Sequence, residues 1–352
     1  MESVCCAASR PLPRRRRRTQ AMPSSPQVSI IMPCFNAAAT VERAISSVLA
    51  QTFTDFELFV VNDASTDNSV ELVKALGAAT GDARVTLIDM PRNVGPSGVR
   101  NEALRAATGT FVAFLDSDDE YLPGFLAHHV GALGSDFDIS MAGHVVVRPD
   151  GSESTRHSAF IGQSTGHEAV RAAMLDEILP FAWDKVYRRT LFSDVAFPEG
   201  STRFEDMTIN ILLDSRARKV TSSPVPLNRY YISSGSLTWG RIPARSDADL
   251  ALADLHQHLP LELRTGSYAK PYATMRLLIT MLTAQSAIMK LAAQPAAQAT
   301  VDDCRRALRP AWIAGAATVK PKFAAAALLL KAAPSTFAKI YLKHSAQSYG
   351  LE

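Results

Sequence analysis

The chain has 352 residues, of which 47% are hydrophobic and 20% are charged, so it can bury a large core and has the composition of a soluble globular protein. Its formal net charge of +3 is due to the first 21 residues, which hold six Arg and one Glu. The remainder carries about −2, which argues against a general electrostatic surface for nucleic acid.

Residues 1–25 are predicted to form a disordered basic tail around the run Arg14–Arg18. No apolar segment follows this run, which disfavours an export signal; contact with anionic lipid is the alternative. Met22 is a second potential start, so it stays open whether residues 1–21 belong to the native protein. The four cysteines have neither metal-ligand nor disulfide-scaffold spacing, and no apolar run is long enough to cross a bilayer. We therefore expect a cytoplasmic protein, free or peripheral on the cytoplasmic face of the membrane.

Short apolar runs alternate with segments of helical periodicity in the first third of the chain. The expected strands are 28–32 (ended by Pro33), 58–61, 85–88 and 111–115, and the expected helices begin at Thr40, follow the polar turn 65–68, and cover 98–107. Strands that alternate with helices in this way predict an α/β fold with a right-handed, mostly parallel sheet.

The alternation becomes less regular after residue 122. A further strand is expected at 139–147, a polar loop near the substrate at 152–165, and a helix at 205–216 with its apolar residues turned inward. The first part of the chain, 26–241, is therefore predicted to be one catalytic domain.

Residues 242–352 are predicted to form a helical extension. They are rich in Ala, Leu and Lys with helical periodicity, most clearly at 272–293 and 322–345. Homo-oligomerisation and contact with the membrane are two alternatives for the extension, the second because lysines flank its apolar runs as in an interfacial helix. These lysines are Lys320, Lys322, Lys331, Lys339 and Lys343. A plain packing helix with a solvated lysine face is the favoured interpretation.

The most informative stretch is 111–119, where an apolar run ends in Asp116, Asp118 and Asp119. In open α/β sheets the carboxyl ends of the strands form the ligand crevice. In an extended chain Asp116 and Asp118 point the same way, and their like charges favour a cation between them. Mg²⁺ or Mn²⁺ together with substrate phosphates is the expected occupant. An acidic turn that caps the next helix is the alternative.

Polar side chains also follow the other predicted strands, at Cys34-Phe35-Asn36, Asn62-Asp63 and Asn93-Val94-Gly95. Phe35 offers a flat apolar surface to a nucleobase, and Asp63 offers it a hydrogen-bond acceptor. Arg92 or Arg100 offers positive charge to a diphosphate. Core packing for Phe35 and a structural ion pair for Arg100 are the alternatives. The chain contains no GxGxxG after its first strand, no GxxxxGK(S/T), no HExxH and no GxSxG, which disfavours the enzyme classes that depend on them.

Four motifs in order over residues 28–120 resemble the family 2 glycosyltransferases, which have the GT-A nucleotide-sugar fold. They are Val28-Ser29-Ile30-Ile31-Met32-Pro33-Cys34-Phe35-Asn36, Val60-Val61-Asn62-Asp63-Ala64-Ser65-Thr66-Asp67, Asn93-Val94-Gly95-Pro96-Ser97-Gly98-Val99-Arg100-Asn101 and Phe114-Leu115-Asp116-Ser117-Asp118-Asp119. Weaker matches follow at Trp183-Asp184-Lys185-Val186-Tyr187, Phe204-Glu205-Asp206, and Tyr230-Tyr231 with Gly235-Ser236-Leu237-Thr238. The family often has Asp-Asp-Gly-Ser where this chain reads Asn62-Asp63-Ala64-Ser65, but the acidic residue for the base is retained.

The resemblance implies a role for each matching residue. Asp63 resembles the carboxylate that accepts a hydrogen bond from the nucleobase, in a pocket shaped by Pro33 and Phe35. Asp116 lies near the ribose and Asp118 ligates the metal in the family's DxD motif, and Asp206 resembles its general base. The expected substrate-binding residues are Pro33, Phe35, Asn36, Asp63, Arg100, Asp116, Trp183 and Lys185.

Three of these assignments keep an alternative. Asp206 can be a carboxylate that only stabilises a helix N-terminus. Lys185 is expected to face the diphosphate or to be a surface lysine, and Trp183 to lie under the acceptor sugar or to pack in the core.

The function expected from these features is an inverting, metal-dependent glycosyltransferase. Its donor would be a nucleotide sugar such as a UDP-sugar, and its acceptor a hydroxyl of a glycan or lipid-linked glycan in cell-surface polysaccharide, wall polymer or glycolipid synthesis. The alternatives are a sugar-phosphate nucleotidyltransferase, whose Gly-rich loop with Arg the chain lacks, and a catalytically decayed nucleotide-sugar-binding protein.

Overall fold

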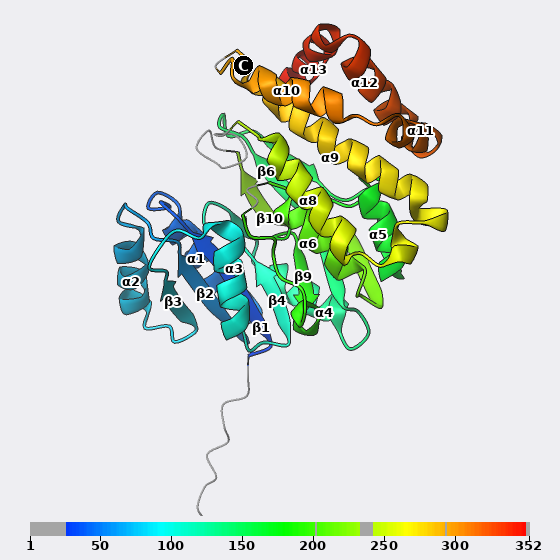
Figure 1. The fold of residues 1–352 in the computed structure, drawn as a ribbon. Helices are drawn as coiled ribbons and strands as arrows, with labels where there is room; N and C mark the ends of the chain where they lie inside the picture. Colours follow the sequence, from blue (N-terminus) through cyan, green and yellow to red (C-terminus); the bar gives the residue numbers. More distant parts are fainter. Residues whose placement is uncertain (1–25, 201–202, 233–241, 293, 350–352) are drawn as a thin grey trace, which may run out of the picture.

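A computed structural model describes residues 26–200, 203–232, 242–292 and 294–349 (Figure 1). The predicted basic tail and the motif Gly235-Ser236-Leu237-Thr238 lie outside these residues.

A ten-stranded mixed sheet runs through the described part of the chain in the order β3-β2-β1-β4-β9-β6-β10-β5, with β7 paired to β6 and β8 to β10. The strands are β1 Val28–Cys34, β2 Phe56–Asn62, β3 Val85–Asp89, β4 Phe111–Phe114, β5 Glu120–Tyr121, β6 Ile139–Val147, β7 Glu153–Arg156, β8 Gly162–Thr165, β9 Lys185–Arg188 and β10 Lys219–Tyr231. The four strands β3-β2-β1-β4 are all parallel, whereas β9 is antiparallel to both of its neighbours. The predicted α/β fold with a mostly parallel central sheet is confirmed.

Helices cover both faces of this sheet, and a further layer of helices follows in the C-terminal part (Figure 1). The α-helices are α1 Val41–Leu49, α2 Ser69–Thr80, α3 Gly95–Ala106, α4 Phe125–Leu133, α5 Gly166–Met174, α6 Glu205–Asp214, α8 Arg245–His258, α9 Ala269–Lys290, α10 Ala297–Ala307, α11 Pro310–Val319, α12 Pro321–Ala332 and α13 Pro334–Tyr349. Within the described ranges, short 3-10 helices cover Arg189–Phe192, Leu261–Leu263 and Gly266–Tyr268. None of the helices that the structure describes is long and apolar enough to span a membrane.

The alternation of side chains along the central strands builds one hydrophobic core on each face of the sheet. Ile30 and Met32 of β1 pack with α1, α2 and α4, whereas Ile31 between them packs with α3, α5, α6 and α8. Every residue of β1 except half-buried Pro33 is buried, which explains its continuous apolar sequence.

Helix α9 joins the sheet domain to the C-terminal helices. Its Met275 and Leu278 belong to the same core as α6 and α8, while Leu277 and Met281 belong to a third core with α10 to α13. The sheet core thus extends past residue 242, although the division into a catalytic domain and a helical extension stays a prediction.

Three expected elements differ from the structure. Pro33 does not end β1, because the strand continues to Cys34, whose O accepts a hydrogen bond from Asp63 N on the β2 side. The backbone of Pro33 faces β4, and the pairing of β1 with β4 already ends at Ile31, so the missing N–H of Pro33 breaks no pair. The polar segment 152–165 is not a plain loop, because it forms β7 and β8. The helix expected over 322–345 is broken before Pro334, since the residue preceding a proline disfavours the helical region.

Candidate active site

The carboxyl ends of β1 and β2 are joined by a network of loop hydrogen bonds. Asn36 adopts a left-handed conformation (φ 49°); its N donates to Ser65 Oγ at 3.0 Å, and its Oδ1 accepts from Thr66 N at 2.8 Å. Ala64 is also left-handed (φ 56°), which explains why the family often has Gly at this position. The predicted substrate residue Asn36 is therefore engaged in positioning the two loops.

Asp63 connects the end of β2 to the start of α3. Its carboxylate is buried and accepts hydrogen bonds from Val94 N at 2.7 Å and Gly95 N at 2.9 Å, one on each oxygen. Phe35, in contrast, is 50% exposed beyond the end of β1, so it does not pack in the core, which was the alternative for this ring. Recognition of a nucleobase by Asp63, Pro33 and Phe35 stays a prediction.

The acidic motif lies on a turn rather than on the extended chain expected for it. Strand β4 ends at Phe114, and Asp119 N donates to Asp116 O at 3.1 Å. Asp116 and Asp118 remain half-buried at the end of the strand. Burial, reinforced by the negative charge of Asp116, raises the pKa of Asp118 to about 6. The turn thus still places two repelling carboxylates together.

Asp119 does not belong to this pair. It is buried, and its Oδ1 accepts a hydrogen bond from Tyr231 N at 2.9 Å, so it ties the turn to the end of β10. Burial and the neighbouring Asp118 raise its pKa well above the usual range. Among the residues that the structure describes, no three His, Cys, Asp or Glu side chains converge as a metal site. The acidic motif therefore offers two carboxylates rather than three.

Arg100 of α3 bridges the acidic turn and the start of α6. Its guanidinium is buried, with Nη2 2.8 Å from Asp116 Oδ1 and Nη1 3.2 Å from Asp206 Oδ1. Burial alone would lower the pKa of Arg100, but the carboxylates of Asp206 and Asp116 outweigh it and raise the pKa. The structural ion pair is thus present, and contact of Arg100 with a diphosphate stays a prediction.

Asp206 lies in the first turn of α6, after Phe204 in a left-handed conformation (φ 66°). Its Oδ2 accepts a hydrogen bond from Ala182 N at 3.0 Å, and burial raises its pKa despite the ion pair with Arg100. Sequence reasoning assigned no role to Glu205 beside it, although the pair Glu205-Asp206 was the available signal. Burial and the charge of Asp206 raise the pKa of Glu205 to about 7.

Lys185 is buried rather than on the surface, which corrects one of its two expectations, and its contact with a diphosphate stays a prediction. Its side chain is 1% exposed, and its Nζ donates to Leu179 O at 2.8 Å, Phe181 O at 2.6 Å and Asp184 Oδ1 at 2.6 Å. All three ammonium donors are therefore used, and Lys185 holds the loop 179–184 on β9.

Trp183 is likewise covered by its neighbours. It is buried, and its ring lies nearly parallel to those of Phe181 (centroids 4.5 Å apart) and Tyr230 (5.4 Å), which are 6.2 Å from each other. The alternative of core packing is therefore the correct one, and the partly exposed rings of this stack are those of Phe181 and Tyr230.

Arg43 of α1 is a member of the site that the sequence did not indicate. Its Nε lies 2.9 Å from Glu120 Oε1, its Nη2 donates to Asp118 O at 2.5 Å, and its guanidinium lies 3.9 Å from the centroid of the Tyr231 ring. Arg43 thus holds the acidic turn against the end of β10, through contacts between residues far apart in the chain.

Comparison with known proteins agrees with this arrangement. Residues 29–196 match the family model for glycosyl transferase family 2. The chain is 28% identical over 240 residues to the glycosyltransferase EpsJ of Bacillus subtilis, covering 66% of this chain and 68% of EpsJ. It is 42% identical over 106 residues to an Escherichia coli UDP-Glc:alpha-D-GlcNAc-diphosphoundecaprenol beta-1,3-glucosyltransferase, covering 30% of this chain and 40% of that protein.

Solved structures share the fold at low sequence identity. S. aureus TarS 1–349 in complex with UDP-GlcNAc has a TM-score of 0.67 and 19% identity, with 92% of each chain covered. The mannosyltransferase PcManGT from Pyrobaculum calidifontis, in complex with GDP-Man and Mn²⁺, has a TM-score of 0.51 and 19% identity, with 87% of each chain covered. The family match over residues 29–196, the relatives and the shared fold together identify these residues as a family 2 glycosyltransferase domain with the GT-A fold.

Proposed function

We propose that the protein is an inverting, metal-dependent glycosyltransferase that moves a sugar from a nucleotide-diphosphate donor to an acceptor hydroxyl. The observation that carries this proposal is the bridge through Arg100, whose guanidinium contacts Asp116 at 2.8 Å and Asp206 at 3.2 Å. A carboxylate from the strand end that would meet the donor is thereby held near a carboxylate suited to activate the acceptor.

The donor side is built from the ends of β1, β2 and β4. Phe35 is exposed for stacking, and Asp63 retains lone pairs beyond the two backbone hydrogen bonds that it accepts. TarS was solved with UDP-GlcNAc and PcManGT with GDP-Man, which supports a nucleotide-sugar donor; we favour a UDP-sugar.

The residues of the acidic turn fit a divalent cation. Asp116 and Asp118 are hard oxygen ligands, and burial together with the charge of Asp116 raises the pKa of Asp118. One or two carboxylates plus substrate phosphates are the usual ligand set for Mg²⁺. We assign the cation to Asp118, with Asp116 toward the ribose. When bound, Mg²⁺ or Mn²⁺ supplies Lewis acidity to the departing diphosphate.

Asp206 is the proposed general base. Its carboxylate takes the proton of the acceptor hydroxyl, the hydroxyl oxygen bonds to the anomeric carbon, and the bond from that carbon to the diphosphate breaks. Because burial raises its pKa, Asp206 is a stronger base than an exposed aspartate. Attack opposite the leaving group in a single displacement gives inversion.

The acceptor is proposed to be a growing polysaccharide or a lipid-linked glycan, since the E. coli relative is a glucosyltransferase acting on a diphosphoundecaprenol-linked sugar and another relative is a succinoglycan biosynthesis protein of Rhizobium meliloti. Peripheral membrane contact and self-association through the C-terminal helices stay predictions.

A panel of UDP- and GDP-sugars with Mn²⁺ and lipid-linked or oligosaccharide acceptors tests this function. A glycosyltransferase releases nucleoside diphosphate, and inversion is read from the anomeric coupling of the product by NMR. Release of pyrophosphate on incubation with a nucleoside triphosphate and a sugar 1-phosphate would instead indicate a nucleotidyltransferase. Donor binding without turnover across the panel, unchanged in Asp206→Asn, would favour a decayed binding protein.

A further inference from the structure

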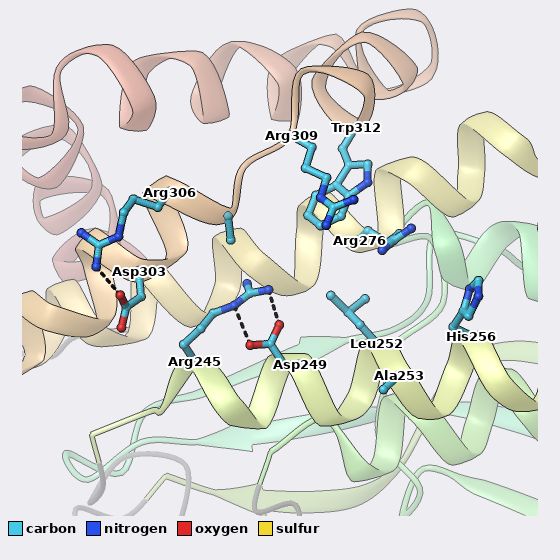
Figure 2. Close-up of a pocket in the computed structure, with 11 residues that line it drawn as sticks. Arg245, Asp249, Leu252, Ala253, His256, Arg276, Asp303, Arg306, Arg309 and Trp312 are labelled. Carbon is cyan, nitrogen blue, oxygen red and sulfur yellow. Dashed lines mark hydrogen bonds and ion pairs between the residues drawn. The ribbon is translucent and has the colours of Figure 1, made fainter.

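A cavity of about 650 Å³ lies between α8, α9, α10 and α11, in the C-terminal helices and apart from the sheet edge that holds the acidic turn (Figure 2). This volume lies within the range of about 300–1,000 Å³ that is typical of small-molecule sites. Four arginines line it: Arg245, Arg276, Arg306 and Arg309. None of the residues discussed as donor or acceptor groups belongs to its lining.

Two of these arginines are neutralised by aspartates on their own helices. Arg245 Nη2 lies 2.5 Å from Asp249 Oδ1, and Arg306 pairs with Asp303. Figure 2 shows both pairs on one side of the cavity. This side therefore carries little net charge.

The other two arginines meet at Trp312. The guanidinium carbons of Arg276 and Arg309 lie 4.6 Å and 5.5 Å from the centroid of the indole ring, and Figure 2 shows the three side chains together. No carboxylate within the described ranges pairs with either guanidinium. Arg276 Nε is also buried with no hydrogen-bond partner in the described structure. Two cations with unused donors are thus gathered around one aromatic ring.

The charge of the surrounding chain does not offset this cluster. Residues 304–351 contain eight Lys or Arg and no Asp or Glu, whereas residues 22–303 contain 23 Lys or Arg and 32 Asp or Glu. The helices α11, α12 and α13 therefore bring no acidic side chain to the cavity. An anion from outside the chain is the remaining source of neutralising charge.

We propose that this cavity is a second ligand site, which binds a phosphoryl group between Arg276 and Arg309 beside Trp312. Guanidinium groups bind phosphoryl oxygens through paired N–H donors, and Arg309 is exposed enough for a ligand to reach it from solvent. The ring of Trp312, which is itself buried, holds both guanidiniums in place. The site is independent of the proposed donor chemistry.

Binding of inorganic phosphate to the full chain in EDTA, without nucleotide, tests the site. Isothermal titration and tryptophan fluorescence are the measurements, with Trp312→Phe as a control because the chain has three tryptophans. We expect the double variant Arg276→Gln/Arg309→Gln to bind phosphate at least about tenfold more weakly than wild type, since it loses the charged donors. Lys322→Gln, which removes a positive charge from the exposed surface of α12 outside the cavity, should bind like wild type.

Circular dichroism and thermal unfolding check that each variant is folded. Arg276→Lys provides a milder change that keeps the charge but removes the paired donors. No phosphate binding by the wild type, or equal binding by the double variant and Lys322→Gln, would overturn the proposal. Unchanged UDP binding by the double variant separates this result from any failure of the donor site.

The phosphoryl group can come from a lipid headgroup or from a soluble phosphate ester. Co-sedimentation with phosphatidylglycerol–phosphatidylcholine vesicles distinguishes these sources. If phosphate competes with the vesicles and the double variant sediments less than Lys322→Gln, the site holds a headgroup. If sedimentation is equal for both variants while phosphate binding still depends on the two arginines, the ligand is soluble.

Discussion

The sheet edge and the C-terminal helices differ in how their cations are paired with carboxylates. At the sheet edge the buried cation Arg100 has two carboxylates within 3.2 Å, and Lys185 has a carboxylate and two carbonyls. Around Trp312, Arg276 and Arg309 have no described carboxylate partner. The edge therefore has an excess of acidic groups, and the helical cavity an excess of basic ones.

This difference suggests which ligand each region needs. A carboxylate excess is relieved by a cation, and at the acidic turn the carboxylate that we assign to the cation is that of Asp118, whose pKa is raised to about 6. An arginine excess is relieved by an anion. The two regions together suit a protein that binds a metal–diphosphate at one place and a phosphoryl group at another.

The largest effect, a loss of kcat, is expected from removing the carboxylate of Asp206, which is paired with Arg100. Asp206→Asn keeps the size of the side chain but removes the base, so kcat should fall by about two to four orders of magnitude. UDP affinity should change little, because Asp206 is not part of the proposed donor site. Diphosphate release at saturating donor measures kcat. The exposed Asp194→Asn is the control, and turnover of Asp206→Asn within threefold of this control would refute the assignment.

The second buried cation of the sheet edge is Lys185, and its ion pair with Asp184 can also be broken by substitution. Lys185→Met leaves the carboxylate of Asp184 buried without its partner, so the free energy of unfolding should fall by about 3–5 kcal/mol. Urea denaturation measures this loss, and the double variant Asp184→Asn/Lys185→Met should recover part of it. Lys322→Met at the surface should be nearly neutral. A stable Lys185→Met with a raised donor KM would instead support the diphosphate role.

How much of the fold and of the site could be predicted depended on how far apart in the sequence the contacting residues lie. The alternation of buried strands and helices predicted the fold, because each element is encoded by its own periodicity, and the helix at 205–216 was found as α6. The strand ends were also located, since parallel strands present their carboxyl ends at one edge. Long-range partners were not predictable: nothing local reveals that Arg43 reaches the 118–120 turn or that the Lys185 ammonium turns inward to the carbonyls of 179–181.

The turn at Asp116–Asp119 was also hard to predict, because its geometry depends on a residue far away in the sequence. The pattern of carboxylates was read correctly as a crowded acidic group, but its geometry depended on Asp119, which Tyr231 N draws into the core from β10. A contact between residues this far apart in the chain therefore separates buried Asp119 from half-buried Asp116 and Asp118.

Removing the carboxylate of Asp118 should change the free energy of unfolding by less than Lys185→Met does. In the absence of metal, it should raise this free energy rather than lower it. Because the pKa of Asp118 is raised to about 6, its ionised form destabilises the folded protein above that pH. In EDTA at pH 8, Asp118→Asn should therefore be more stable than wild type by about 1–3 kcal/mol. Mn²⁺ should stabilise wild type and not the variant. Thermal unfolding with and without Mn²⁺ measures both, and a destabilised Asp118→Asn in EDTA would contradict the proposed repulsion.

The smallest effect is the pH dependence of metal binding at the same carboxylate. A raised pKa means that the folded protein holds the Asp118 proton more tightly than the unfolded chain, so the apo protein gains stability as pH falls from about 6 toward 4, while the form that binds metal is lost. Mn²⁺ affinity, measured by isothermal titration in the absence of donor, should be about tenfold weaker at pH 5 than at pH 7. Glu205 also titrates near this range, with a pKa of about 7, but it lies on the acceptor side of Arg100. Glu205→Gln should therefore keep the midpoint near pH 6. If the midpoint moves with Glu205→Gln, the titrating group lies at the start of α6, and the cation is held by both sides of the Arg100 bridge.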